Sequence, residues 1–157
     1  MIRAASVEDI PALQSLSSGD IWNPRMPLDW YTARINDSSI APKILVWQDE
    51  QGSPIGEMMI SLRPPPYLRF PQDADDGMLY LANLRVQESQ RRRGVGSELV
   101  KELVKMGKEI GRGIRLECDG KKDNLIAWYG KFGFEVVEYQ GNIEEYKVCG
   151  QVVMEIL

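Results

Sequence analysis

Hydrophobic and polar residues follow two periods along the chain, and the changes between them mark the predicted elements. The clearest helical pattern ends at a stop signal, Gly111, and places apolar residues at Val95, Leu99, Leu103, Met106 and Ile110. Ser6 followed by Asp9 resembles a capping box, which predicts a shorter helix through Leu16. Two further helices are expected over residues 28–35 and 123–131.

Short apolar runs bounded by turn residues predict strands over residues 2–5, 43–48, 55–62, 78–86, 114–118, 134–139 and 146–157. The turn at 49–53 joins the second and third strands as a hairpin, and the last two strands form another. Two prolines make residues 20–27 a loop, and Pro64-Pro65-Pro66 with an acidic stretch makes 63–77 a long one. The pattern predicts an α/β (α+β) fold in a single domain over 1–157, a mixed sheet of about 6–7 strands flanked by about four helices.

Composition narrows the classes of function. A chain of 157 residues with 43% apolar and 27% charged residues can bury one globular core. The net charge of -4 argues against a nucleic-acid partner. The first residues lack the apolar run of a signal peptide, and no stretch reaches the roughly 18 apolar residues of a membrane span, so we expect a cytoplasmic protein with no membrane partner.

The chain contains no histidine and two cysteines. The lack of histidine excludes Ser-His-Asp and Cys-His mechanisms and removes the commonest ligand of transition metals. Cys118 and Cys149 are too few and too far apart for a good zinc site, and reduced thiols are expected. We therefore expect no metal.

The segment between the strand ending at Val86 and the helix beginning near Val95 carries the candidate chemistry. It reads Gln-Arg-Arg-Arg-Gly-Val-Gly-Ser over residues 90–97. A strand that enters a helix through a tight turn points unpaired N–H groups at one spot, where the helix dipole adds positive charge. Glycines let the backbone approach a pyrophosphate, and arginines add donors. The segment predicts diphosphate binding, against the alternative of a solvated basic turn.

Three known phosphate-binding motifs contain glycines at a comparable spacing. The P-loop pattern is absent, and the dinucleotide fingerprint needs a third glycine where the chain has Leu99. The remaining pattern, Arg/Gln-x-x-Gly-x-Gly, is met by Arg91, Gly94 and Gly96 and resembles the acetyl-coenzyme A turn of the GNAT N-acetyltransferase superfamily. A second segment, Trp-Tyr-Gly-Lys-Phe-Gly-Phe over 128–134, looks like the family's second signature. The order of elements also matches, so the resemblance covers essentially the whole chain.

The resemblance implies that acetyl-CoA is a co-substrate, bound in the splay between the strands near residues 78–86 and 112–118. It implies that backbone N–H groups around Leu84 polarise the thioester and that Tyr129 is the general acid, although on composition alone Tyr129 could be a packing residue. Homodimers are frequent in the superfamily. The cofactor contacts carried over are Leu84, Arg85, Val86, Arg91, Arg92, Arg93, Gly94, Val95, Gly96, Ser97, Asn124 and Tyr129.

Two departures from the family pattern leave roles open. Many relatives place a carboxylate in the strand before the turn, where this chain has Ala82 beside Asn83. Glu57, or a water held by Asn83, is the candidate for removing the proton of the amine, and Glu117 is a weaker one; each carboxylate could instead be a surface charge. Relatives often have an asparagine at the position of Lys122, so the contact by Asn124 is an expectation only.

The acceptor should be recognised by the variable loops. The candidate residues are Trp22, Arg25, Asp75 and Asp76, and the acidic ones could attract a cationic amine or form a solvated acidic loop. The expected function is transfer of an acetyl group to a primary amine of a small molecule by direct attack in a ternary complex. The alternatives are a protein or peptide N-acetyltransferase, a catalytically silent acetyl-CoA-binding module, and an adaptor that uses no cofactor.

Overall fold

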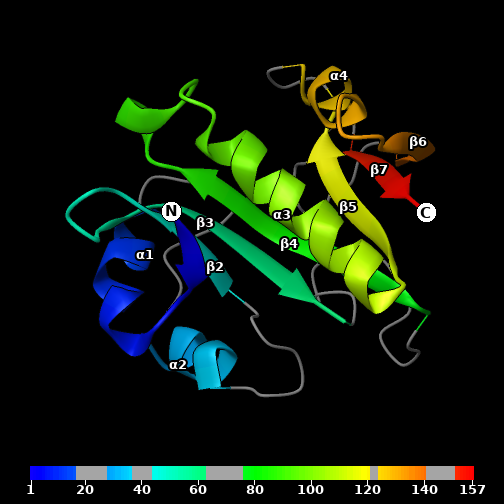
Figure 1. The fold of residues 1–157 in the computed structure, drawn as a ribbon. Helices are drawn as coiled ribbons and strands as arrows, with labels where there is room; N and C mark the ends of the chain where they lie inside the picture. The colour runs from blue at the N-terminus through cyan, green and yellow to red at the C-terminus, as the bar shows by residue number, and fades with distance from the viewer. Residues whose placement is uncertain (17–27, 37–43, 63–75, 121–123, 141–150) are drawn as a thin grey trace. The chain divides into compact units, whose positions relative to one another are not determined.

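A computed structural model describes residues 1–16, 28–36, 44–62, 76–120, 124–140 and 151–157 (Figure 1). It has a mixed seven-stranded sheet in the order β1-β2-β3-β4-β5-β7-β6. The strands are β1 (Ile2–Ala4), β2 (Ile44–Gln48), β3 (Pro54–Ser61), β4 (Met78–Val86), β5 (Gly113–Asp119), β6 (Glu135–Gln140) and β7 (Gln151–Ile156). The α-helices among these residues are α1 (Ile10–Leu16), α2 (Leu28–Asn36), α3 (Val95–Ile110) and α4 (Leu125–Gly130), with 3-10 turns η1 (Val7–Asp9) and η2 (Glu88–Gln90). The expected fold class is confirmed.

Several element bounds match the sequence-based prediction closely. The bounds of β4 and α3 are as predicted, and Gly111 ends α3 with a φ of 68°. The capping box of Ser6 and Asp9 is present, although it opens η1, which leads into α1. The predicted helix from residue 123 instead begins at Leu125, after Asn124 in a left-handed conformation. No helix in the described ranges is long and apolar enough to cross a membrane.

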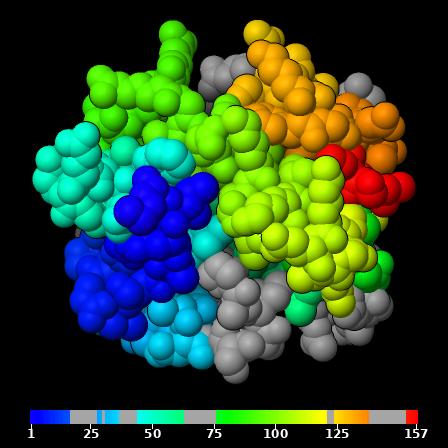
Figure 2. Space-filling model, viewed as in Figure 1, coloured from blue at the N-terminus to red at the C-terminus, as the bar shows by residue number. Residues whose placement is uncertain are grey.

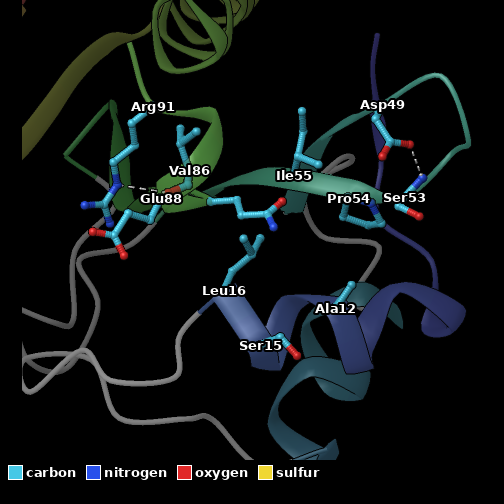
Figure 3. A pocket seen from close by; sticks show the side chains of 11 residues that line it. Ala12, Ser15, Leu16, Asp49, Ser53, Pro54, Ile55, Val86, Glu88 and Arg91 are labelled. Atoms are coloured by element: carbon cyan, nitrogen blue, oxygen red, sulfur yellow. Dashed lines mark hydrogen bonds between the residues drawn. The ribbon is translucent and has the colours of Figure 1, made fainter. Parts of the chain in front are cut away.

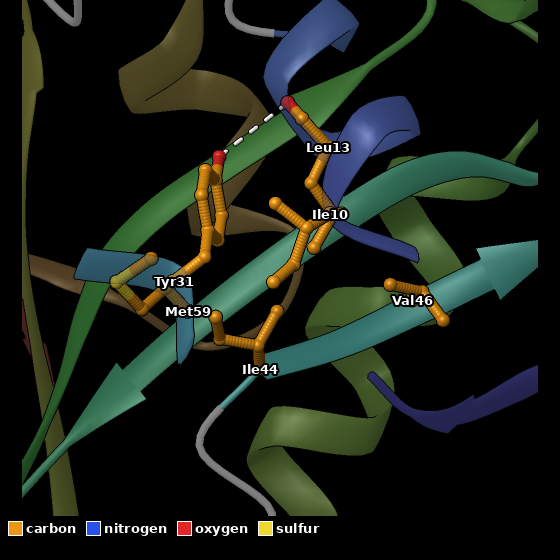
Figure 4. Packing of buried hydrophobic residues seen from close by; sticks show 6 residues of the cluster. All are labelled: Ile10, Leu13, Tyr31, Ile44, Val46 and Met59. Carbon is orange, nitrogen blue, oxygen red and sulfur yellow. Dashed lines mark hydrogen bonds between the residues drawn. The ribbon is translucent and has the colours of Figure 1, made fainter. Parts of the chain in front are cut away.

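The chain forms two compact units, the first from residues 1–61 and 82–100 and the second from 62–81 and 101–157. In the first unit, α1 and α2 pack on one face of the sheet (Figure 4). The buried members of this core are Ile10, Leu13, Tyr31, Ile44, Val46 and Met59. On β3, Glu57 pairs in register with Val46, and Met59 pairs with Ile44. Because paired residues share a face, the Glu57 side chain lies on the face that carries this core.

The start of α3 packs closely on β3 in the same unit. A Cβ atom added at Gly56 would lie 2.9 Å from Cγ1 of Val95 and 3.4 Å from both the carbonyl of Arg85 and Cδ1 of Leu99. Real Cβ contacts are hardly ever that short, so glycine at position 56 is what lets the first turn of α3 rest on the strand. A larger residue there would displace the helix start.

The second unit contains the first part of β4 paired in parallel with β5, and β5 paired with β7, which in turn pairs with β6. A polar cluster links its strands. Arg115 donates from Nη1 to Oδ2 of Asp76 and to the Tyr80 hydroxyl, both at 3.0 Å. Its Nε donates to Glu155, and the Tyr80 hydroxyl donates to Asp76. Burial is the main cause that raises the pKa of Tyr80, to about 12.

Candidate active site

The connection from β4 to α3 forms a tight turn rich in donors. Arg92 and Gly94 both have left-handed backbones, with φ of 62° and 86°. No backbone carbonyl of the described residues accepts a hydrogen bond from the N–H groups of residues 92–97, and the first bond of the helix runs from Glu98 N–H to the Gly94 carbonyl at 3.0 Å. The N–H groups therefore lie together at the positive end of a 16-residue helix. This is the backbone arrangement that binds phosphate groups.

The arginine side chains of this turn are exposed. The segment that carries them lies at the surface in the space-filling view (Figure 2). Arg91 donates from Nε to the Val86 carbonyl at 3.2 Å, and Arg93 donates from Nη1 to Oε1 of Gln90 at 3.3 Å. Each guanidinium has five N–H donors, so these bonds hold the side chains while leaving donors for an anion.

The pairing of β4 changes along its length. Its first four residues pair with β5, from Met78 opposite Gly113 to Leu81 opposite Leu116. Residues 82–86 lie outside this register and belong to the first unit. On the other side of β4, the Gln87 N–H donates to the Ile55 carbonyl at 2.9 Å. Within this stretch, the backbone N–H of Leu84 is therefore a candidate for binding a ligand carbonyl.

Two side chains of β4 bond to a single buried carboxylate on β3. Oε1 of Glu57 accepts from Nη1 of Arg85 at 3.0 Å and from Nδ2 of Asn83 at 3.2 Å. Glu57 is 0% exposed, whereas Asn83 is partly exposed. Burial raises the pKa of Glu57, and the charge of Arg85 and the hydrogen bonds around the carboxylate offset this only in part. The reading of Glu57 as a surface charge is therefore wrong, because the structure buries it.

Tyr129 lies on α4 in the second unit and is 7% exposed. Its ring contacts Trp128 and Phe134 edge to face, with centroids 4.8 and 5.7 Å away. Burial, with a smaller contribution from Cys118, raises the pKa of the hydroxyl. The Cys118 thiol is buried too, which raises its pKa to about 11. The Tyr129 phenol therefore stays protonated at neutral pH, and Cys118 stays a thiol.

A model of the acetyltransferase (GNAT) family matches residues 7–134. This span is most of the chain. The chain belongs to the GNAT acetyltransferase family. It is accordingly an acyltransferase, and the resemblance drawn from Arg91, Gly94 and Gly96 is confirmed at the level of the family.

Solved structures agree with this GNAT assignment, although their low identities carry the fold alone. The chain is similar to ribosomal-protein-alanine N-acetyltransferase from Brucella melitensis, with 20% identity, a TM-score of 0.79, and coverage of 100% of this chain and 99% of that one. It is also similar to an N-acetyltransferase from Staphylococcus aureus Mu50, with 20% identity, a TM-score of 0.79, and coverage of 99% of this chain and 96% of that one. A third similar structure is yncA from Salmonella typhimurium, solved with its cofactor acetyl-CoA, with 16% identity, a TM-score of 0.77, and coverage of 99% of this chain and 92% of that one. No curated protein sequence matches significantly.

The remaining predicted site residues of this GNAT chain differ in their surroundings, and some lie outside the described residues. Asn124 is exposed and precedes α4 with a φ of 53°. Asp76 is ion-paired with Arg115, which it shares with Glu155, and it accepts from the Met78 N–H at 3.0 Å, so its carboxylate is already engaged within the second unit. Trp22, Arg25 and Asp75 lie outside the described residues. No group of three metal-binding side chains occurs within the described ranges.

The first unit contains a cavity of about 610 Å³ that no sequence pattern indicates (Figure 3). It lies between α1, the β2–β3 turn and the end of β4. The lining residues include Ser15, Leu16, Ile55, Val86 and Arg91. In Figure 3, the Arg91 side chain bends back to the Val86 carbonyl at one side of this cavity. Its walls come from three segments far apart in sequence, which spacing rules do not bring together.

Proposed function

We propose that this GNAT enzyme transfers the acetyl group of acetyl-CoA to a primary amine of a small molecule, by direct attack in a ternary complex. The observation that carries the proposal is the donor-rich turn at residues 91–97. Its N–H groups, the start of α3 and three arginines provide the chemistry that a pyrophosphate needs. Within the proposal, residues 91–97 hold the diphosphate of coenzyme A and the whole chain acts as one domain.

Residues 82–86 of β4 are proposed to hold the thioester. The backbone N–H of Leu84, outside the β5 register, would donate to the carbonyl oxygen as negative charge develops on it. The amine nitrogen attacks the carbonyl carbon, a C–N bond forms and the C–S bond breaks. Tyr129 donates its proton to the departing sulfur, so that coenzyme A leaves as a thiol; the nitrogen gives up one proton to solvent as the amide forms, and Tyr129 recovers a proton from solvent. The raised pKa of Tyr129 supports this role, because the phenol stays protonated.

An alkyl amine with a pKa of about 10.4 is almost entirely protonated at pH 7, a deficit worth roughly 4.6 kcal/mol. The proton must therefore leave before attack. Between the two candidates on the sheet, we favour a water held by Asn83, because Asn83 is partly exposed and Glu57 is not. The ammonium gives its proton to this water, which passes it to bulk solvent.

A protein or peptide N-terminus is the second candidate acceptor. Its support is the name of one similar structure, ribosomal-protein-alanine N-acetyltransferase from Brucella melitensis. An N-terminal amine has a pKa of only about 7.7–8.0, so it needs less help with deprotonation than an alkyl amine. The expected homodimer and cytoplasmic location also stay proposals, which sedimentation and cell fractionation would check.

The proposal is tested first by thermal unfolding of the protein with acetyl-CoA, coenzyme A, ATP or NAD. A ligand present at 100 times its dissociation constant should stabilise the protein by about 2.7 kcal/mol. We expect stabilisation by the two coenzyme A species alone. Thiol release from acetyl-CoA is then measured with spermidine, glucosamine and an alanine-initiated peptide, which separates the two acceptor classes. No stabilisation by acetyl-CoA would refute the proposed function.

A further inference from the structure

The Glu57–Arg85 ion pair is buried inside the first unit, next to the strand proposed to hold the thioester. The two side chains are 0% and 7% exposed, and Oε1 of Glu57 lies 3.0 Å from Nη1 of Arg85. Among the residues that the structure describes, Oε2 of Glu57 finds no hydrogen-bond partner. Burying two charged side chains costs desolvation free energy that two apolar side chains would not. Fold stability alone is therefore a weak explanation for a buried ion pair at this position.

The hydrogen bonds to Oε1 of Glu57 also set the orientation of the Asn83 amide. An ionised carboxylate only accepts hydrogen bonds, so the Asn83 amide must present its NH₂ group to Glu57. Nδ2 of Asn83 lies 3.2 Å from Oε1, which agrees with this requirement. The amide oxygen of Asn83 must then point away from Glu57. The charge of Arg85, 3.0 Å from the same oxygen, favours the ionised form of Glu57 that this orientation requires.

The three side chains also differ in access. Glu57 and Arg85 are buried, whereas Asn83 is partly exposed and lies within residues 82–86. An acceptor amine, or a water that bridges to it, can therefore reach Asn83 and cannot reach the Glu57 carboxylate without rearrangement.

We infer that Glu57 and Arg85 are positioning residues, which fix the Asn83 amide so that its oxygen accepts a hydrogen bond from the acceptor amine or its bridging water. This inference rests on the proposed function. It assigns no proton transfer to Glu57. The proton of the ammonium goes to water and on to solvent.

Paired substitutions test this, because a single change at Glu57 would leave Arg85 charged and buried. Glu57→Gln/Arg85→Met removes both charges but keeps an oxygen that can accept from Asn83. Glu57→Met/Arg85→Met has similar bulk and no acceptor. With the fastest of spermidine, glucosamine and the alanine-initiated peptide, kcat of the Gln/Met variant should fall less than about tenfold, whereas Met/Met and Asn83→Ala should both lose about 10²-fold.

A second readout needs no acceptor. The side-chain amide NMR signals of Asn83, identified by their loss in Asn83→Ala, should stay close to their positions in Gln/Met and shift in Met/Met. Absence of stabilisation by acetyl-CoA in the wild type would instead count against the proposed function. A Gln/Met variant as slow as Asn83→Ala would make the Glu57 carboxylate the base and overturn the inference. Wild-type rates or unmoved amide signals in Met/Met would also overturn it.

Discussion

Replacing Tyr129 by phenylalanine should lower kcat by about 10²–10⁴-fold, because the leaving sulfur would lose its proposed proton donor. The substitution removes only the hydroxyl, so the ring contacts with Trp128 and Phe134 remain. Thermal stability and the stabilisation by acetyl-CoA should change little. Since burial raises the pKa of Tyr129, the wild type should show no loss of kcat from its ionisation up to about pH 10. Steady-state thiol release across pH, with thermal unfolding, checks both statements.

Tyr80 offers a matched control in the same protein. It is 0% exposed, and its hydroxyl donates to Asp76 and accepts from Arg115. Tyr80→Phe should cost about 1–3 kcal/mol of stability, because it leaves the partners of the hydroxyl unsatisfied, while kcat stays near that of the wild type. Full kcat in Tyr129→Phe would exclude the general-acid role. If the wild type already turns over no amine and Tyr129→Phe changes nothing, the silent binding module becomes the better account.

Placing a carboxylate at Gly94 should abolish stabilisation by acetyl-CoA. Gly94 has a φ of 86°, and a Cβ atom there meets no protein atom within 4 Å, so it projects into the open space of the turn. In Gly94→Glu, the new negative charge would repel the diphosphate from the N–H groups of residues 92–97. Thermal unfolding with and without acetyl-CoA measures the effect.

Gly52 separates backbone strain from loss of binding. Its φ is 85°, and a Cβ atom there also meets nothing within 4 Å. Gly52→Glu and Gly94→Glu should therefore lose similar stability, about 1–2 kcal/mol for a left-handed residue that is no longer glycine. Only the second should lose the response to acetyl-CoA. Equal stabilisation of both variants by acetyl-CoA would refute a diphosphate site at this turn.

Local spacing was enough to predict α3 and its turn. Val95, Leu99 and Leu103 recur at helical spacing and are all buried, and a glycine follows the last helical residue. The start of α4 was predicted two residues early, because Asn124 takes a left-handed conformation that the sequence pattern does not encode. The segment from 128 to 134 covers the end of α4 and the turn before β6.

Long-range polar contacts were not predictable from spacing. Arg85 is 28 residues from Glu57, and Arg115 is 39 residues from Asp76, so no periodicity links them. A signal for Glu57 was nevertheless present. It interrupts the apolar run Ile-Gly-Glu-Met-Met-Ile over residues 55–60, all of which the fold buries. A charge in a strand buried on both faces needs a buried partner, which limits the search to arginine and lysine on neighbouring strands.

The left-handed backbone of Arg92 sets thermal stability against cofactor affinity. Any residue other than glycine is strained at a φ of 62°, and here the strain falls on a residue whose exposed guanidinium is proposed to face the diphosphate. Glycine would relax the backbone and remove the cation in the same step. Directed evolution for thermal stability alone would therefore favour glycine at position 92 and lower the proposed affinity for coenzyme A. A selection scheme should always include turnover at limiting acetyl-CoA.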